Sequence, residues 1–477
     1  MSDDAFTTAS VQTALQTQID PIVSFRNSQG QAVRGTILSL QRKSLVMEIY
    51  NPYSIVQVSE VLGALTIRQN AKNVYFGNAV ITNIVNTGLT IIVSVTLTDV
   101  WRVLSDEISN PITIGLQARV FVDEWERRFG IRSSYQTAVN ELRTFLAEIS
   151  RWVEQLDLST TIPKENEQLR RDYFDELAEP LIEKSGEYVR ALEAEAALVE
   201  PEHAPVHRAF CQASLHPLML RAPFVFRTYT KPLGYAGDYQ MVNQIIDDPR
   251  QGPNTYFKIV NTLFLRASVA SAHRNRIDIL FNFLVQLADR AQAEGRPFRL
   301  LNVGCGPAIE IQRFLQEYEQ PQWLQFTLLD FSTETLDWTR AKLEMICARR
   351  HSQLQCQFVH ESVHNLLRRR IQAMPDSAQE FDAVYCAGLF DYLPDKVCAR
   401  LMQHFAGRIR HGGKLLVTNV HSDCPEKFSM EHILEWYLIY RDQKRLASLL
   451  PNNCRDSQLS VDATGVNVFA VTTIWQA

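Results

Sequence analysis

This sequence of 477 residues lacks the marks of several protein classes. Its 8 cysteines form no Cys-x-x-Cys pair and no cluster with the spacing of a zinc site. The longest apolar runs, such as Gly88–Leu97, are too short and too rich in threonine to span a bilayer. The N-terminus, Met1-Ser2-Asp3-Asp4, is acidic and has no apolar stretch of the kind found in signal peptides. We therefore expect a reduced, cytoplasmic protein with no transmembrane segment and no bound metal.

Excess positive charge is absent as well. The chain has 48 Lys and Arg against 53 Asp and Glu, a formal net charge of -5, so nothing in its charge favours wrapping a nucleic acid. Hydrophobic residues make up 46% of the chain, which is ordinary for globular proteins that bury sizeable cores. At roughly 100–200 residues a domain, the length allows two to four domains. We expect a multidomain globular protein that does not wrap a nucleic acid.

The N-terminal part alternates apolar and polar residues with a period of two. Val56-Gln57-Val58-Ser59 and Val93-Ser94-Val95-Thr96-Leu97 are examples, and Asn27-Ser28-Gln29-Gly30 supplies a turn. Short strands with tight turns and no long helix predict a small β-barrel or sandwich. We assign residues 1–20 to a tail and residues 21–118 to the barrel.

Residues 119–255 form the expected helical connector. Apolar residues recur at helical spacing over Tyr135–Leu156 and again over Glu165–Leu198. The connector ends in a Gly/Tyr loop, Lys231-Pro232-Leu233-Gly234-Tyr235-Ala236-Gly237-Asp238-Tyr239, which has no amphipathic period. Linkers favour Ser, Glu and Pro over tyrosine, so we expect an ordered loop that lines a pocket rather than a simple linker.

Residues 256–477 alternate strands and helices. Apolar runs predict seven strands, the last two forming a hairpin at Thr464-Gly465. Helices are expected between the earlier strands, among them Pro394–Arg410, ended by His411-Gly412-Gly413, and a long helix over Glu426–Leu450. Such alternation predicts a doubly wound α/β sheet that is mainly parallel.

The first of these strands leads into a glycine turn. Arg299–Val303 is followed by Gly304-Cys305-Gly306 and by a helix-compatible segment from Ile309. The glycines allow backbone N–H groups to approach a ligand at the start of the helix. The dinucleotide fingerprint requires a third glycine where Ile309 stands, which disfavours NAD.

This pattern resembles a class I S-adenosylmethionine (SAM) methyltransferase over about residues 256–477. The glycine turn matches the first motif of the family, although Asn302 stands where the family usually has an acid. Asp330 follows the second strand, where the family binds the ribose hydroxyls, and Glu361-Ser362 falls where it contacts the adenine. The resemblance implies a SAM site made of Asn302, Gly304, Cys305, Gly306, Asp330, Phe331, Glu361, Ser362, Cys386 and Gly388.

A narrower resemblance covers about residues 200–477. The Gly/Tyr loop, His273-Arg274-Asn275-Arg276, Gly388–Leu393 and Glu435–Arg441 are similar to a bacterial group that includes methyltransferases making 3-hydroxypalmitic acid methyl ester, a quorum-sensing signal. This implies O-methylation of the carboxylate of a small lipid-like acid. For that acid we expect catalytic or carboxylate-binding roles for Tyr235, Tyr239, Tyr440 and Arg441, and substrate contacts from Phe390, Asp391 and Trp436. The spacing of Trp436 and Tyr440 on the expected helix also fits a core role.

The barrel leaves a second function open. Arg34–Tyr50 resembles the start of a PilZ domain, but neither of the two cyclic di-GMP motifs of that family is complete in Ser39–Leu45. The alternative function is therefore a regulatory or scaffold protein whose barrel senses a ligand such as cyclic di-GMP, with the methyltransferase fold as a partner module. The central helices make a homodimer plausible.

Overall fold

The computed structural model describes residues 19–49, 56–69, 72–86, 91–99, 101, 115, 118–119, 122, 130–159, 166–319, 323–353, 355–368 and 381–476. Nearly all of the expected tail, residues 1–20, lies outside these ranges. The chain divides into two compact units. The first contains residues 1–132, 199–209 and 233–235, and the second contains 133–198, 210–232 and 236–477.

The first unit holds the predicted β-barrel. Its six strands are β1 (Ile19–Arg26), β2 (Ala32–Leu40), β3 (Ser44–Ile49), β4 (Val61–Gln69), β5 (Lys72–Asn86) and β6 (Ile91–Leu97). They close in the order β1-β2-β3-β6-β5-β4, and every pair is antiparallel. Alternate residues of β6 are buried, as a strand with one face toward the barrel interior requires. The sequence left barrel and sandwich open, and the structure shows a barrel.

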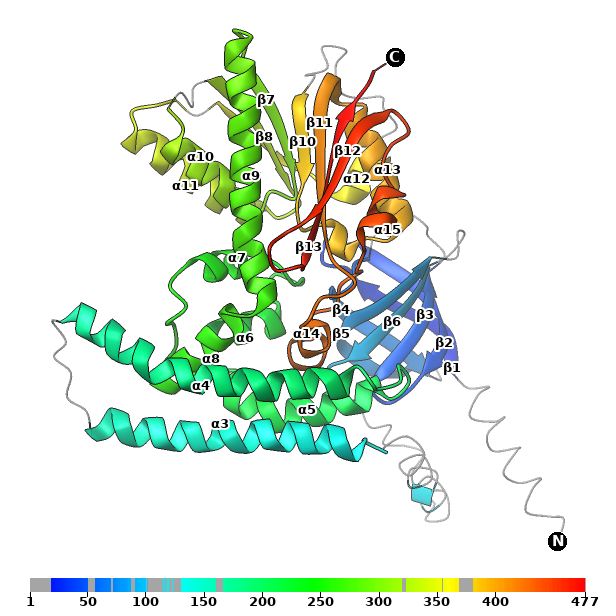
Figure 1. The fold of residues 1–477 in the computed structure, drawn as a ribbon. Helices are drawn as coiled ribbons and strands as arrows, with labels where there is room; N and C mark the ends of the chain where they lie inside the picture. The colour runs from blue at the N-terminus through cyan, green and yellow to red at the C-terminus, as the bar shows by residue number, and fades with distance from the viewer. Residues whose placement is uncertain are drawn as a thin grey trace. The chain divides into compact units, whose positions relative to one another are not determined.

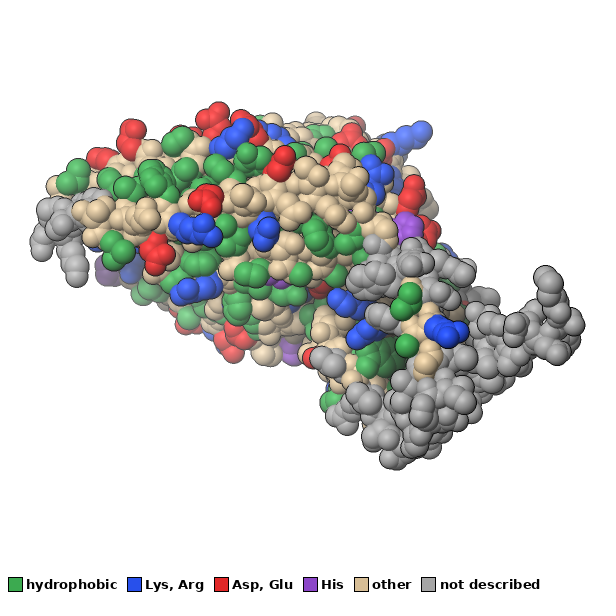
Figure 2. Space-filling view, turned by 90° about the horizontal axis from the view of Figure 1, so that it is seen from below, with side chains coloured by type: hydrophobic (Ala, Val, Ile, Leu, Met, Phe, Trp, Pro, Cys, Tyr) green, Lys and Arg blue, Asp and Glu red, His purple; other side chains and the backbone are tan. Residues whose placement is uncertain are grey.

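The second unit begins with helices. They are α3 (Ser133–Ser159), α4 (Glu167–Ala196), α5 (Ala204–Met219, which starts in the first unit), α6 (Pro223–Thr230), α7 (Tyr239–Ile246), α8 (Thr255–Leu265) and α9 (Ser268–Ala293). The apolar stripe of α3 includes Val139, Leu142, Leu146 and Val153, all of which are buried. Over the described part of the face in Figure 2, apolar side chains are scattered among charges of both signs.

The same unit ends in a seven-stranded sheet (Figure 1). The strands are β7 (Phe298–Val303), β8 (Leu324–Asp330), β9 (Cys356–His360), β10 (Phe381–Cys386), β11 (Ile409–Val420), β12 (Cys454–Val461) and β13 (Asn467–Ile474). Their order is β12-β13-β11-β10-β7-β8-β9. β7 to β11 pair in parallel, and β13 runs antiparallel to both β11 and β12. The predicted doubly wound sheet of seven strands is confirmed.

The remaining helices follow these strands in the chain. They are α10 (Ile309–Glu317), α11 (Thr333–Arg349), α12 (Val363–Arg368), α13 (Asp395–Ala406), α14 (Lys427–Leu434) and α15 (Gln443–Ala447), with a short 3-10 turn, η2, at Phe390–Tyr392. Helix α14 packs against α4 and α6 rather than against the sheet. In Figure 1, α10 and α11 lie on one side of the sheet, and α13 and α15 lie on the other. Successive strands are added outward from β7 and then from β10, so the strand order reverses between these two neighbours. Ligands of open α/β sheets bind at the carboxyl ends of the strands at such a switch point.

Two helix predictions are wrong. The expected helix Glu426–Leu450 breaks after Leu434, because Glu435 caps α14 in the left-handed conformation with a φ of 49°. Trp436–Arg441 then runs without helix, and its N–H groups at Ile439 and Arg441 donate to the carbonyls of Asp391 and Val420. His411-Gly412-Gly413 does not end a helix but lies inside β11, since α13 already stops at Ala406.

Among the described residues, no helix combines the length and the apolar character needed to cross a bilayer.

Candidate active site

The glycine turn closes around the end of β8. The backbone N–H groups of Gly304 and Cys305 both donate to the Leu329 carbonyl, at 2.8 and 3.0 Å. Gly304 and Gly306 have φ values of +67° and +50°, a region that side-chain-bearing residues rarely adopt. A Cβ on Gly306 would meet nothing within 4 Å, so the turn presents bare backbone to open space just before α10. This geometry suits a ligand that approaches the chain closely.

Asp330 is tied to this turn. Its carboxylate accepts hydrogen bonds from the backbone N–H groups of Gly306, at 3.1 Å, and Ser332, at 3.0 Å. Burial raises the pKa of Asp330, and these backbone hydrogen bonds oppose the rise. A carboxylate can accept about four hydrogen bonds, so Asp330 keeps capacity for a ligand.

The end of β9 adjoins Asp330. The Glu361 backbone N–H donates to the Asp330 carbonyl at 3.0 Å, and the Glu361 carboxylate accepts from the Ser362 N–H at 3.1 Å. The Nε2–H of His360 donates to the Phe331 carbonyl at 2.8 Å. The structure thus brings together four of the predicted residues: Asp330, Phe331, Glu361 and Ser362.

A buried acid beside the turn was missed by the sequence reasoning. Glu310, in the first turn of α10, accepts from the Asn302 side-chain amide at 3.3 Å and from the Tyr385 hydroxyl at 2.5 Å. Burial raises its pKa, and the hydrogen bond from Tyr385 opposes the rise. The next helix thus places an acid in contact with Asn302. An acid just after Gly304-Cys305-Gly306 was the available signal.

The turn after β10 faces an arginine from α9. The Gly388 N–H donates to the Thr418 hydroxyl at 3.0 Å, and a Cβ on Gly388 would lie 2.9 Å from Nη1 of Arg276. Burial lowers the pKa of Arg276, while the charges of Asp391 and Glu310 oppose this. Within the described residues, the Arg276 guanidinium makes no hydrogen bond or ion pair. The sequence motif His273–Arg276 contains this arginine, but its pattern alone indicates no role for Arg276 at the site.

Arg441 has a different role from the one expected. It is fully buried, and its guanidinium donates to Asp395, to the side chain of Asn419 and to the carbonyls of Phe390 and Leu393, at 2.5–2.8 Å. All three of its nitrogens are engaged, so no donor is left for a substrate carboxylate. Arg441 holds the turn after β10 in place.

The other residues predicted to contact the substrate differ in their burial and in their hydrogen bonds. Trp436 donates from Nε1 to the Tyr392 hydroxyl at 3.0 Å. Asp391 is buried and accepts from the Val420 N–H at 2.6 Å. Phe390 is fully buried beside it, and the hydroxyl of Tyr440 is buried with no hydrogen-bond partner among the described residues.

The Gly/Tyr loop is ordered and is shared between the units. Asp238 caps α7 and pairs with Arg227 at 2.8 Å, and the Tyr239 hydroxyl donates to Glu334 of α11 at 2.9 Å. Gly237 has a φ of +79°, and a Cβ there would lie 2.6 Å from the Tyr392 hydroxyl. Tyr235 belongs to the first unit with Gly234, whose carbonyl accepts from the Val61 N–H at 2.8 Å. Tyr239 therefore lies on the Asp330 side of the site, beside α11.

Residues 300–413 match a family model described as "Methyltransferase domain". The second unit contains a methyltransferase domain. The match spans the glycine turn, Asp330, Glu310 and the turn after β10. The predicted class of enzyme, a SAM-dependent methyltransferase, is confirmed.

Solved structures similar to the chain include methyltransferases. A possible exported protein from Bordetella parapertussis is 15% identical, covers 53% of this chain and 86% of its own, and gives a TM-score of 0.40. Magnesium protoporphyrin IX methyltransferase from Synechocystis PCC 6803, bound to S-adenosylhomocysteine, is 12% identical over 52% of this chain and 98% of its own, with a TM-score of 0.36. The N-methyltransferase NodS from Bradyrhizobium japonicum WM9 is 11% identical over 50% and 98%, with a TM-score of 0.31. No curated protein matches the chain.

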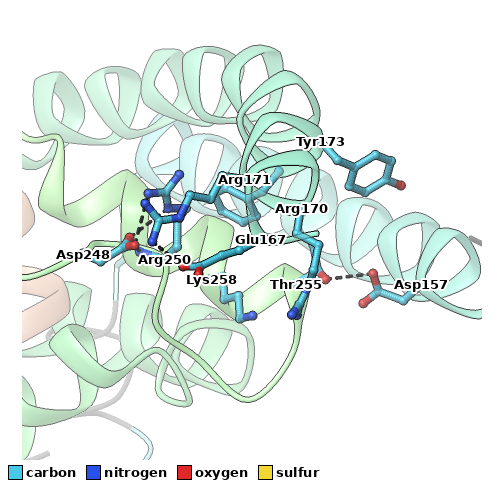
Figure 3. Close-up of a pocket in the computed structure, with 10 residues that line it drawn as sticks. Asp157, Glu167, Arg170, Arg171, Tyr173, Asp248, Arg250, Thr255 and Lys258 are labelled. Carbon is cyan, nitrogen blue, oxygen red and sulfur yellow. Dashed lines mark hydrogen bonds and ion pairs between the residues drawn. The ribbon is translucent and has the colours of Figure 1, made fainter. Parts of the chain in front are cut away.

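The unit that carries the methyltransferase domain also has a polar cavity of about 400 Å³, lined by residues of α3, α4, α8 and the segment before α8 (Figure 3). Arg250 pairs with Asp248 and Asp175, and the Thr255 hydroxyl donates to Asp157 at 2.8 Å. Arg171 pairs with Glu167, whereas Arg170 and Lys258 have no ion-pair partner among the described residues. In the described part of the chain, no group of three or more His, Cys, Asp or Glu residues is placed to hold a metal ion.

Proposed function

We propose that this enzyme transfers the methyl group of SAM to the carboxylate of a small lipid-like acid, with 3-hydroxy fatty acids as the substrate class. The observation that carries the proposal is Arg276, which lies beside the turn after β10 and whose guanidinium makes no hydrogen bond or ion pair with any described residue. Guanidinium groups bind carboxylates through two parallel hydrogen bonds. The narrower sequence resemblance supports the same substrate class.

The residues around the glycine turn fit SAM. Asp330 would accept from the ribose hydroxyls, Glu361 and Ser362 would face the adenine, and Glu310 would face the ammonium group, with the bare backbone of Gly304–Gly306 beneath. SAM supplies an electrophilic methyl carbon, and the protein has to align the acceptor with it and exclude water. A carboxylate with a pKa near ~4–5 is already ionised at pH 7, so the reaction needs no general base. That suits a turn beside which Arg276 lies, followed by an Asp391 that already accepts a hydrogen bond.

The direct test combines donor binding with product detection. Calorimetric titration should show binding of SAM and of S-adenosylhomocysteine, and mass spectrometry should show a methyl ester when 3-hydroxypalmitate is added. Failure of the wild-type protein to bind SAM would sink the proposal. Binding of SAM without methylation of any fatty acid would leave the enzyme class and remove the substrate class.

Replacing Arg276 tests the carboxylate partner. We expect R276Q to raise the KM for the fatty acid about 10–100-fold, because one charge-assisted bidentate pair is lost, while R276K retains part of the effect. Arg276 faces two candidate carboxylates, that of the fatty acid and that of the methionine part of SAM. Calorimetry with SAM tells them apart. A weaker SAM affinity with an unchanged KM for the acceptor would assign Arg276 to the donor instead.

Glu310 gives a prediction with a pH dependence. Its folded pKa is raised above the ordinary value of 4.5, so the stability contributed by the protonated form is present below that pH and is lost as the pH rises through the folded pKa. E310Q should therefore gain stability relative to wild type at pH 8 but not at pH 4, as thermal unfolding would show. It should also bind SAM about tenfold more weakly, because a charged acceptor for the ammonium is gone. Equal stability changes at both pH values would contradict this account.

The regulatory alternative rests on the separate barrel unit. Arg42 and Lys43 are exposed at the β2–β3 turn, where a PilZ-like ligand site would need cations. A thermal shift with cyclic di-GMP that is lost in R42A would favour this function, and no shift at saturating ligand would remove it. The homodimer remains a prediction that the measured molecular mass in solution would test.

A further inference from the structure

A second cavity of the C-terminal unit is apolar. It has a volume of about 390 Å³ and lies among α4, the α6 start, α8, the start of α9 and α14. Side chains that line it include Ile182, Val189, Phe224, Phe264, Met430 and Trp436. The volume falls in the range of small-molecule sites, which are typically about 300–1,000 Å³ and mainly apolar.

One helix links this cavity to the turn after β10. Val269 and Ala270 of α9 line the cavity, the His273 ring lies 6.3 Å from the ring of Trp436, and Arg276 lies against Gly388. These positions are spaced three or four residues apart, so they share one face of the helix. At 1.5 Å per residue, Val269 and Arg276 are about 10 Å apart along the axis.

Between Val269 and Arg276, this face of α9 presents no charged side chain. Burial lowers the pKa of His273 to about 3, so this ring is neutral, and Nδ1 lies 2.8 Å from the Val269 carbonyl. Arg274 and Asn275 point elsewhere: Arg274 donates to the carbonyls of Ile245 and Leu265, and Asn275 donates to Asp462. The wall opposite is Trp436, whose Nε1 is engaged by Tyr392.

We propose that this cavity binds the apolar tail of the methyl acceptor, whose carboxylate then reaches Arg276 along the shared face of α9. The inference rests on the proposed function for its head group. The cavity proposed for the tail contains none of the residues proposed to bind SAM. One carboxylate oxygen of Glu426 is buried at the cavity without a hydrogen-bond partner among the described residues, and it could accept from a hydroxyl on the acyl chain.

Gly186 of α4 offers a clean way to fill the cavity. It lines the cavity, and a Cβ there would meet only the end of the flexible Arg190 side chain, at 3.3 Å. Replacing a glycine inside a helix also favours helix formation, so G186L should fold. The matched control is E187L, which places a leucine at the neighbouring exposed position of α4.

The experiment compares acceptors of two lengths. G186L should raise the KM for 3-hydroxypalmitate about tenfold or more, because a few methylenes lose their burial, and should leave the KM for 3-hydroxybutyrate unchanged. Displacement of bound cis-parinaric acid, a fluorescent fatty acid, should weaken in parallel. SAM affinity should stay the same in G186L, and E187L should behave as wild type in every assay.

Each outcome decides between the two proposals. If G186L changed the KM of both acceptors equally, or of neither, the tail site would be overturned. The enzyme class would still stand if the protein bound SAM. Wild-type protein that binds SAM but not parinaric acid would do the same. Parinaric acid binding that G186L abolishes, in a protein that binds no SAM, would keep the cavity as a fatty-acid site and overturn the proposed reaction.

Discussion

D330A is expected to weaken SAM binding about 100-fold or more. The carboxylate of Asp330 is fixed by the backbone of Gly306 and Ser332, and two hydrogen bonds from ribose hydroxyls to a charged acceptor contribute about 1.5 kcal/mol or more each. Calorimetric titration measures the loss directly. D330N should fall between D330A and wild type, because its amide oxygen still accepts.

The control for D330A is the cap of α11. The Ser332 hydroxyl accepts from the Thr335 N–H at 3.2 Å, so S332A removes a helix cap without touching the carboxylate. We expect S332A to cost about 1 kcal/mol of stability and to keep its SAM affinity. If D330A binds SAM as well as S332A does, Asp330 only shapes the turn.

R441M is expected to lower the free energy of unfolding by about 3–5 kcal/mol, because three buried acceptors each lose a charged donor and Asp395, which is partly exposed, loses its buried partner. The change would strip Asn419 and the carbonyls of Phe390 and Leu393 of their donor in a buried setting. Urea unfolding measures the shift. Arg445 also pairs with Asp395 but is half exposed, so R445M should cost less than about 1 kcal/mol and serves as the control.

The effect of R441M should depend on pH. Burial tends to raise the pKa of Asp395, but the hydrogen bonds from Arg445 and Arg441 outweigh it, so the pKa lies below its ordinary value of 3.8. Stability from this pair is present above that ordinary value and is lost as the pH falls through the folded pKa. The difference between R441M and wild type should therefore shrink in acid. A variant of normal stability with a selectively raised KM for the acceptor would restore the substrate-binding role first expected for Arg441.

The sequence predicted the parts of the fold that depend on periodicity. Apolar alternation predicted β6 (Ile91–Leu97) correctly but was wrong at Val56–Ser59, which lies before β4 and outside the strands. The runs from Phe298 to Trp475 specified the seven-stranded sheet. Gly304, Gly306 and Asp330 follow the neighbouring parallel strands β7 and β8, so the strand pattern alone predicted that they would lie at one edge of the sheet, while their role in binding SAM stays a prediction.

Features that depend on tertiary contacts escaped prediction. The break at Glu435 carries neither glycine nor proline, and the segment after it leaves the helix to hydrogen-bond with η2 and with the end of β11. Arg441 therefore turned inward, although its sequence neighbours indicated only an amphipathic helix. Glu310 lies on α10 and Arg276 on α9, two helices that flank the site. No spacing rule in the sequence relates either residue to Gly388.

The assignment of residues 199–209 and 233–235 to the barrel unit has a practical consequence. The chain passes between the two units at 132/133, 198/199, 209/210, 232/233 and 235/236, so they are not joined by one linker. No single cut can release either unit intact. A truncated chain that begins at α8 would lack α3, α4 and the Asp238 cap, together with a wall of the apolar cavity. Loss of activity after such a deletion would report a broken scaffold, and the role of the barrel is better sought through point substitutions on its surface.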